Sequence, residues 1–304
     1  MREPHPSAIY LAGPTASGKS AAALELARRL GGEIISVDSM QVYRGLDIGT
    51  AKPTPAERAA VPHHLIDVCT LEQAFDAAQF VKLARQAETE IRARGRVPIF
   101  CGGTGFYFKG LLHGVSEAPP ADAAVREQLA REPMEELLRE LQTLDPVAYG
   151  RMDRNNPRRV LRAMEVIRLT GRPYSSFAVE PANLGGPTVY VLQRDPADLK
   201  ARISLRVKEM FAQGLIEETR GLLPLGLREN ITAMQAIGYR QVVEYLDGKR
   251  PLDETVALVI TRTQQFARRQ LTWFRHQLPV IQVNVPHDGQ PGELIWQKLT
   301  GQRG

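Results

Sequence analysis

The residues of this sequence that are best suited to chemistry form a phosphate-binding loop near the N-terminus. They fit the pattern G-x-x-x-x-G-K-[ST] over eight positions: Gly13, Pro14, Thr15, Ala16, Ser17, Gly18, Lys19 and Ser20. In this pattern the glycines let backbone N–H groups turn toward a polyphosphate, the lysine supplies a positive charge, and the final hydroxyl can bind Mg²⁺. A helix that follows the loop adds its dipole to the anion site. We therefore expect a bound diphosphate or triphosphate, with Ser20 as a ligand of Mg²⁺.

Asp38 is a second candidate for chemistry, because it directly follows an apolar, β-rich run at residues 33–37. Ligands of parallel α/β sheets bind at the carboxyl ends of the strands, so we expect Asp38 to lie near the phosphate loop. The alternative is that Asp38 only caps the next helix, which is a frequent role of aspartate.

A glycine-rich turn, Gly102-Gly103-Thr104-Gly105, follows another β-rich run at residues 97–101. Its glycines would let the backbone and the Thr104 hydroxyl approach a ligand closely. A tight turn with a purely structural role is the alternative. The adjacent His63 and His64 have no further ligands at metal-binding spacing, so we expect no metal site there.

These candidate residues need a parallel sheet to bring them together, and the sequence alternates between strand-like and helix-like segments. The β-rich runs are residues 8–12, 33–37, 97–101, 188–193 and 280–285. The clearest amphipathic helical stretches are residues 20–30, 77–94 and 199–211. This alternation is typical of a parallel sheet with helices on both faces. We predict an α/β fold, a P-loop NTPase-like parallel sheet flanked by helices.

One segment interrupts the alternation of strands and helices. Between residues 116 and 186 the strand signal disappears, and helical stretches occupy residues 122–131, 134–141 and 157–170. We therefore predict a catalytic core made of residues 1–115 and 186–304, and a helical insertion domain made of residues 116–185.

The composition indicates where such a protein would work. A chain of 304 residues can bury a substantial core. It has no apolar run near the roughly 20 residues of a membrane span, and its first residues lack the apolar part of a secretory signal. Its two cysteines cannot build a disulfide framework, which fits a reducing cytoplasm. We expect a cytoplasmic monomer with no membrane partner.

Positive charge is concentrated in two segments, although the net charge is only +5. Seven arginines lie between residues 151 and 172, against Asp153 and Glu165 alone, and residues 255–287 contain no acidic residue. One predicted helix in the second segment has an arginine-bearing face and an apolar face, formed respectively by Arg268, Thr272 and Arg275 and by Ala267, Leu271 and Phe274. An ordinary solvated face usually carries compensating acidic residues. We therefore expect a phosphate-rich partner larger than a nucleotide.

Taken together and in this order, the motifs resemble the signatures of the bacterial tRNA dimethylallyltransferase family. The matching segments are residues 13–20, Asp38 to Gln41 with Tyr43, 62–67, 102–107, 156–162 with Ala163 and Glu165, 236–241 and 268–275. The resemblance covers nearly the whole chain. Phe106 stands where the family commonly has an aliphatic residue, and Arg158 stands where it commonly has Gln.

The resemblance implies transfer of a dimethylallyl group from dimethylallyl diphosphate to the exocyclic amine of the adenosine just 3′ of the anticodon of tRNA. The phosphate loop and Mg²⁺ would bind the diphosphate. By the same resemblance, Asp38 would accept the proton of the amine, Thr104 would donate a hydrogen bond to the bridging oxygen, and Arg220 would be a second diphosphate contact.

The resemblance also implies which residues contact the tRNA anticodon stem-loop. They are Asp38, Ser39, Met40, Gln41, Thr104, Arg126, Arg158, Arg159, Val160, Leu161, Arg162, Gln235, Ala236, Ile237, Gly238, Tyr239, Arg240, Arg268, Arg269, Gln270, Leu271, Thr272, Trp273, Phe274 and Arg275.

Three other functions share parts of this pattern. A small-molecule kinase that binds ATP would use the phosphate loop but would leave the two basic segments unexplained. An adenylate prenyltransferase, whose acceptor is a free nucleotide, would need no surface for an anticodon loop. A non-catalytic RNA-binding module would not need Asp38, Thr104 and the phosphate loop together.

Overall fold

A six-stranded parallel sheet organises the protein, for which the computed structural model describes residues 6–179 and 188–301. The strands are β1 (Ile9–Ala12), β2 (Glu33–Val37), β3 (His63–His64), β4 (Pro98–Gly102), β5 (Val189–Arg194) and β6 (Val280–Val285). They lie in the order β3-β2-β4-β1-β5-β6, and all five neighbouring pairs are parallel. The predicted α/β fold is confirmed.

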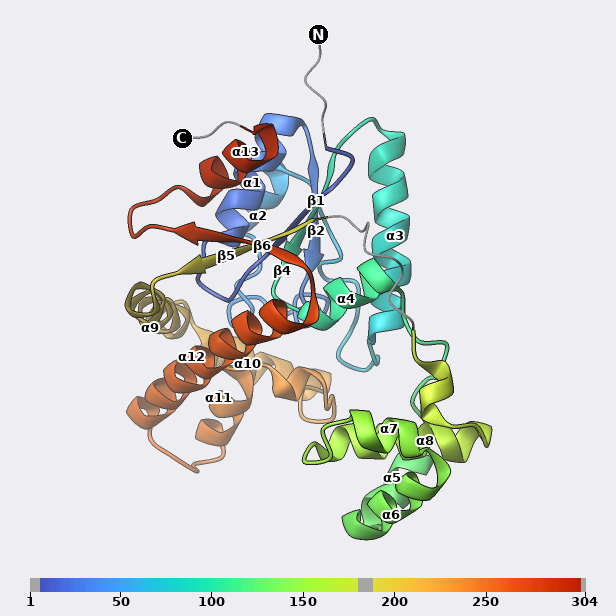
Figure 1. Cartoon of the computed structure of the whole chain (residues 1–304). Coiled ribbons are helices and arrows are strands. Elements are labelled where there is room, and N and C mark those ends of the chain that lie inside the picture. The colour runs from blue at the N-terminus through green and yellow to red at the C-terminus, as the bar shows by residue number, and fades with distance from the viewer. Residues whose placement is uncertain (1–5, 180–187, 302–304) are drawn as a thin grey trace. The chain divides into compact units, whose positions relative to one another are not determined.

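Helices cover both faces of the sheet (Figure 1). Because side chains alternate along a strand, Ile9 and Leu11 of β1 pack on one face with α1 (Lys19–Leu30) and α13 (Pro291–Thr300). Tyr10 packs on the other face, which is covered by α3 (Ala77–Ala93), α4 (Gly105–His113) and α12 (Leu252–Gln277). Burial of both faces explains why the strands appear in the sequence as continuous apolar runs.

Further helices extend the sheet-bearing part of the chain. They are α2 (Pro55–Ala60), α9 (Pro196–Ala212), α10 (Leu215–Leu222) and α11 (Tyr239–Leu246), with short 3₁₀ helices at Leu223–Leu225 and Ala233–Gln235. The α9 helix packs against α12 through residues that include Ile203 and Val259. Among the described residues, no helix is both long enough and apolar enough to cross a membrane.

The chain divides into two compact units. One is formed by Met1–Leu112 and Gly185–Gly304, and the other by His113–Leu184. The described part of the second unit contains α5 (Ala123–Arg131), α6 (Met134–Leu144), α7 (Pro146–Arg151), α8 (Pro157–Thr170) and a 3₁₀ helix at Tyr174–Phe177. It has its own core, which includes Leu129, Leu137, Leu141, Val160 and Met164. We call the first the sheet unit and the second the helical unit.

The sequence located five strands to within one residue but missed the sixth, β3. This edge strand has only two residues, too few for any period to be visible, and it pairs His63 with Ile34 and His64 with Ile35. His64 Nε2 lies 2.6 Å from a carboxylate oxygen of Glu33. The histidine pair therefore belongs to the edge of the sheet.

Candidate active site

The sheet brings three predicted reactive segments together at the carboxyl ends of adjacent strands. Because β2, β4 and β1 are neighbours, Asp38, Thr104 and the phosphate loop, which follow these strands, lie at one edge of the sheet. Hydrogen bonds of Thr104 join the ends of β2 and β4. The Thr104 N–H donates to Val37 O at 3.2 Å, and the Ser39 N–H donates to Thr104 Oγ1 at 3.1 Å.

The phosphate loop contains two residues with positive φ. Ala16 (φ 63°) and Gly18 (φ 94°) both adopt the left-handed conformation, which is uncommon for a residue with a side chain such as Ala16. Lys19 extends back along the loop, and its Nζ donates to Pro14 O at 3.2 Å. Burial lowers the pKa of Lys19. An ammonium that has lost hydrating water gains strongly from an anion placed beside it.

Two hydroxyls of the loop fit a bound phosphate and its metal ion. Ser17 Oγ is buried and has no hydrogen-bond partner among the described residues, and such an orphaned group indicates a partner from outside the chain. Ser20 is exposed in the first turn of α1. No cluster of three His, Cys, Asp or Glu side chains in the described ranges could hold a metal. Mg²⁺ commonly takes one or two protein oxygens and completes its shell with phosphate oxygens and water, so Ser20 beside a diphosphate fits this ion.

Asp38 is half-buried, and its two carboxylate oxygens have different surroundings. Oδ1 accepts from the N–H groups of Met40 at 2.8 Å and Gln41 at 3.4 Å, so the capping role is present in part. Oδ2 has no hydrogen-bond partner among the described residues. The Asp38 charge raises the pKa values of Lys19 and Arg206 against the stronger effect of their burial. Asp38 therefore lies within electrostatic reach of two cations, with one oxygen fixed and one available.

The glycines of the turn after β4 are required by packing. A Cβ atom would lie 2.3 Å from Gln270 Nε2 if it were added at Gly103, and 2.1 Å from the Trp273 ring if it were added at Gly105. This corrects the interpretation that these glycines admit a ligand, because the space is taken by α12. Thr104 lies between them and is half-buried.

Gln270 was expected to contact tRNA, and its position corrects that expectation. Its side chain is buried, Oε1 accepts from the Thr15 N–H at 3.1 Å, and Nε2 donates to Gly103 O at 2.9 Å. Phe274 is also fully buried on the same helix. Both side chains pack in the interior of the protein.

The rest of α12 has the two faces predicted from its spacing. Ala267 is buried, whereas Arg268, Thr272 and Arg275 are exposed. Within the described ranges, neither Arg268 nor Arg275 forms an ion pair with an acidic side chain. Two exposed guanidinium groups without internal partners suit an anionic ligand.

Arg220 has no described contact with the phosphate loop. It lies on α10, its side chain is 58% exposed, and its Nη1 is 3.6 Å from Glu217 Oε1. A diphosphate contact through this residue therefore stays a prediction.

Three other arginines lie close to the phosphate loop, and the sequence reasoning missed them. Arg194 Nε donates to Ser17 O at 3.0 Å, and Arg202 Nε donates to Ala16 O at 3.2 Å. Arg206 follows Arg202 by one turn of α9, and burial lowers its pKa. The i, i+4 spacing of Arg202 and Arg206 on a predicted amphipathic helix was the signal that could have found them.

Comparison with known proteins assigns the chain to a family. A family model described as IPP transferase matches residues 41–277. The chain belongs to the IPP transferase family. It is 47% identical over 278 residues to the tRNA dimethylallyltransferase of Halorhodospira halophila, covering 88% of this chain and 90% of the relative. It is 45% identical over 291 residues to that of Geobacter metallireducens, covering 91% and 92%.

Solved structures of this family have the same fold. The full-length tRNA isopentenylpyrophosphate transferase of Bacillus halodurans superposes with a TM-score of 0.71 at 37% identity, covering 97% of this chain and 94% of that one. A eukaryotic dimethylallyltransferase acting on tRNA has a TM-score of 0.78 at 26% identity, covering 91% and 73%. The resemblance to tRNA dimethylallyltransferases found in the sequence is thus confirmed.

In this IPP transferase, two more of the predicted tRNA contacts have structural partners. Tyr239 is fully buried, and its hydroxyl donates to Glu218 Oε1 at 2.5 Å and accepts from the Gly49 N–H at 3.1 Å. Gln41 Nε2 donates to Thr50 O at 3.2 Å. Both side chains hold the loop of residues 46–51. The burial of Tyr239 leaves its side chain no surface for tRNA, whereas Gln41 is half-buried and its contact with tRNA stays a prediction. In the nearby segment the buried residues are Ala236 and Gly238, Ile237 is half-buried, and the exposed ones are Gln235 and Arg240.

The helical unit exposes only part of its predicted tRNA surface. Arg158 and Arg159 are exposed on α8, Leu161 is half-buried and Val160 is buried in the core of the unit. The side chains of Arg126 and Arg162 bind the buried Glu165, at 2.9 Å and 2.7 Å. Arg168 is 2.7 Å from Glu140. The expectation that the arginines of residues 151–172 lack compensating acidic partners is therefore wrong for Arg162 and Arg168. The partner of Arg168 lies on another helix, so the local sequence around Arg168 did not reveal it.

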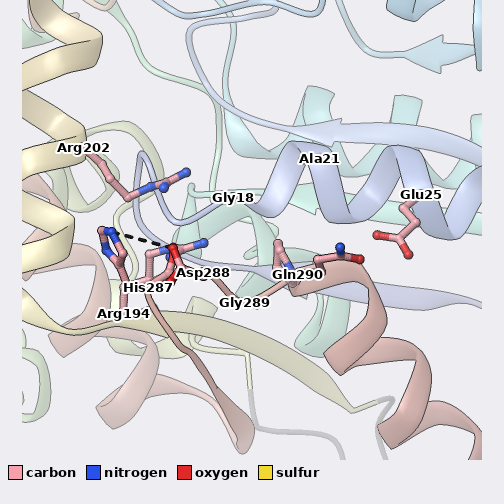
Figure 2. A pocket seen from close by; sticks show the side chains of 10 residues that line it. Gly18, Ala21, Glu25, Arg194, Arg202, His287, Asp288, Gly289 and Gln290 are labelled. Atoms are coloured by element: carbon pink, nitrogen blue, oxygen red, sulfur yellow. Dashed lines mark hydrogen bonds and ion pairs between the residues drawn. The ribbon is translucent and has the colours of Figure 1, made fainter.

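Two cavities border the phosphate loop and Arg206 in this IPP transferase. The first, of about 350 Å³, is lined by Gly18, Arg194, Arg202, His287 and Gln290 among others, beside the segment that joins β6 to α13 (Figure 2). The second, of about 860 Å³, lies between residues 47–58 and α9, and its lining includes Lys52, Arg58, Asp67, Arg206 and Glu209. Arg206, whose pKa the Asp38 charge raises against the stronger effect of burial, belongs to the lining of the second cavity.

Proposed function

We propose that this protein is a tRNA dimethylallyltransferase. It transfers the dimethylallyl group of dimethylallyl diphosphate to N6 of the adenosine 3′-adjacent to the anticodon, and it releases diphosphate. The observation that carries the proposal is the convergence of the phosphate loop, Asp38 and Thr104 at one edge of the sheet. Relatives that are 45–47% identical and named for this activity support it.

The donor side of the reaction needs stabilisation of a leaving group. Cleavage of the allylic C–O bond leaves carbocation character on the five-carbon group and negative charge on the diphosphate. Lys19 and the N–H groups of the phosphate loop stabilise that charge where it develops. Thr104 Oγ1 accepts from the Ser39 N–H at 3.1 Å, and its own hydrogen makes only a long hydrogen bond, of 3.5 Å, to Ser39 Oγ. That hydrogen can turn to the bridging oxygen when the donor is bound. Arg220 is the proposed second diphosphate contact.

Mg²⁺ is the proposed cofactor, with Ser20 and diphosphate oxygens as its ligands. When bound, it neutralises part of the diphosphate charge. The exposure of Ser20 at the start of α1 supports this assignment, since a metal held there could share its shell with the donor.

The acceptor side of the reaction needs a base. The exocyclic amine of adenine is a weak nucleophile because its lone pair is delocalised into the ring. Asp38 Oδ2 accepts the amine proton as the new C–N bond forms, while Oδ1 stays bound to the Met40 N–H. The adenine must leave the stack of the anticodon loop to reach this carboxylate.

The exposed arginines favour a polymeric acceptor over free adenylate. Arg268 and Arg275 on α12, and Arg158 and Arg159 on α8, are the side chains we assign to phosphates of the anticodon stem-loop. A small-molecule kinase would not require them. We further propose that the protein acts as a cytoplasmic monomer.

The test is incubation with dimethylallyl diphosphate, Mg²⁺ and unmodified tRNA, followed by digestion and mass analysis of the nucleosides. The expected result is one dimethylallyl group on the adenosine next to the anticodon. Two parallel reactions replace tRNA with AMP and dimethylallyl diphosphate with ATP. Prenylation of AMP with no change in tRNA, or consumption of ATP alone, would contradict the proposal.

A further inference from the structure

The side chain of Gln270 joins three segments that lie far apart in the sequence. Its Oε1 accepts from the N–H of Thr15, 255 positions away, and its Nε2 donates to the carbonyl of Gly103, 167 positions away. The residue is only 7% exposed, so water hardly competes for either hydrogen bond. One amide therefore connects α12 to two turns at the edge of the sheet.

Both of these turns carry groups that act on the leaving diphosphate. Thr15 belongs to the phosphate loop, and Gly103 immediately precedes Thr104. The phosphate loop binds the diphosphate of the donor, and the Thr104 hydroxyl donates to the bridging oxygen of the same molecule. The distance between the two turns must therefore be fixed. A misplacement of about 1 Å in such a pair can lower a rate by roughly 100-fold.

The chemistry of glutamine suits this position closely. The residue must accept from one N–H and donate to one carbonyl, and an uncharged amide does both. An ionised glutamate could only accept, and a methionine of similar length could form neither strong hydrogen bond. The fit is tight, since a Cβ at Gly103 would come within 2.3 Å of Gln270 Nε2.

A second contact of α12 is made with Gly105, the residue that follows Thr104. The Trp273 ring, three residues after Gln270, fills the space against Gly105, where a Cβ would lie 2.1 Å from it. Thr104 is thus flanked by two residues that α12 holds in place. The opposite face of the same helix exposes Arg268 and Arg275.

We propose that Gln270 is a positioning residue of the transfer reaction, which holds the phosphate loop and the Thr104 turn at the separation that the donor requires. It thereby links the helix with the exposed arginines to the donor site. The inference rests on the proposed function for its kinetic consequence. Gln270 itself touches neither the donor nor the tRNA.

The experiment compares Gln270→Met and Gln270→Glu with the wild type. Gln270→Met removes both hydrogen bonds, whereas Gln270→Glu keeps the acceptor for Thr15 and loses the donor to Gly103. Gln265→Met is the matched control, because Gln265 is an exposed glutamine of the same helix. Single-turnover rates are measured at saturating tRNA on fractions shown to be folded by thermal unfolding, together with tRNA affinity.

The expected result is a rate about 10- to 100-fold lower in the Gln270 variants that fold, with tRNA affinity within about twofold of the wild type. Gln265→Met should match the wild type in both. A rate within about twofold of the wild type in the folded variants would overturn the proposal. So would weaker tRNA binding with an unchanged rate at saturation, since Gln270 would then be a tRNA contact.

A second measurement separates this inference from the proposed function. Binding of inorganic diphosphate in the presence of Mg²⁺ is measured by calorimetry for the same proteins. We expect about tenfold weaker binding in Gln270→Met, because the Thr15 end of the loop loses its anchor. If the wild type transfers no prenyl group, the proposed function fails, and unchanged diphosphate binding in Gln270→Met would then overturn the positioning role as well.

Discussion

At the level of single residues, the reactive groups are oriented by backbone amides. The Met40 N–H holds one oxygen of Asp38, and the Ser39 N–H holds the hydroxyl of Thr104. These donors belong to one turn after β2, so a single stretch of backbone sets the positions of both groups. A backbone N–H does not titrate, so both donors keep their hydrogen at every pH at which the protein is folded.

Replacement of Asp38 by Asn tests its role as the base. The amide keeps an oxygen that can accept from the Met40 N–H, but it cannot take a proton from the adenine amine. We expect the turnover to fall by about 10²-fold or more, with a much smaller change in tRNA affinity. Single-turnover prenylation and tRNA binding are the measurements.

Asp153→Asn is the matched control for the Asp38 variant. Asp153 is exposed, and its Oδ1 accepts from the N–H two residues later, at 3.1 Å from Asn155, as Asp38 does with Met40. Its variant should keep wild-type turnover. Near wild-type turnover in Asp38→Asn would remove this residue from the mechanism.

Thr104 is tested by a pair of substitutions that separate its hydroxyl from its shape. Thr104→Val keeps the shape and loses the hydroxyl, and the expected fall in the single-turnover rate is about 10²-fold, as for other donors to a developing charge. Thr104→Ser keeps the hydroxyl and should retain most of the rate. A Thr104→Val enzyme that shows only a higher Michaelis constant for the prenyl donor would assign the hydroxyl to ground-state binding instead.

Candidate site residues could be found from the sequence more readily than their hydrogen-bond partners. Asp38 and Thr104 were identified from their positions after strands, but the hydrogen bond between their turns depends on the strand order. Gln270 was misassigned because it sits among exposed basic residues. Its spacing from Ala267 and Phe274, at i+3 and i−4, places it on the apolar face, so helical periodicity could have predicted its burial. Its partners, 255 and 167 positions away, could not be predicted.

At the level of elements, α12 has two tasks on opposite faces. One face inserts Gln270 and Phe274 into the sheet unit, and the other exposes Arg268 and Arg275. The position of the arginine face in the sequence was predictable, because long helices have a regular period. The hydrogen bond between Tyr239 and the loop at Gly49 was not predictable, because it joins residues 190 positions apart.

The exposed face of α12 is tested through the salt dependence of tRNA binding. If Arg275 contacts a phosphate, Arg275→Ala should reduce the slope of log affinity against log salt by roughly 0.7 to 0.9. Diphosphate binding should barely respond. Arg131→Ala is the control, since Arg131 is exposed but paired with Glu127 at 2.6 Å. An unchanged slope and unchanged affinity in Arg275→Ala would make this face ordinary solvated surface.

At the level of the whole molecule, each unit contains a buried carboxylate bound by arginines. In the sheet unit, Arg94 and His64 bind Glu33. In the helical unit, Arg126 and Arg162 bind Glu165, whose side chain is fully buried. Burial alone would raise the pKa of Glu165, but the hydrogen bonds from Arg162, Arg126 and the Asp122 N–H together outweigh it and lower the pKa. The helical unit therefore depends on the ionised form of Glu165.

A pKa that is lower in the folded state gives a defined pH dependence of stability. The stabilisation from Glu165 is fully present above the pKa of an unfolded glutamate, about 4.3, and it is lost as the pH falls through the folded value. Glu165→Gln, which removes the charge, should therefore lower the stability of the helical unit at pH 7 by about 1–3 kcal/mol. The difference from the wild type should shrink as the pH falls below 4.

The two units can be followed separately during this test, because both tryptophans, Trp273 and Trp296, lie in the sheet unit. Urea unfolding is monitored by tryptophan fluorescence for the sheet unit and by circular dichroism for the helices of both units. Glu165→Gln should shift part of the dichroism transition at pH 7 and leave the fluorescence transition in place. Glu127→Gln, at an exposed ion pair, should shift neither. If the fluorescence transition moves with the dichroism, the two units unfold as one, and Glu165 supports the whole molecule rather than the helical unit alone.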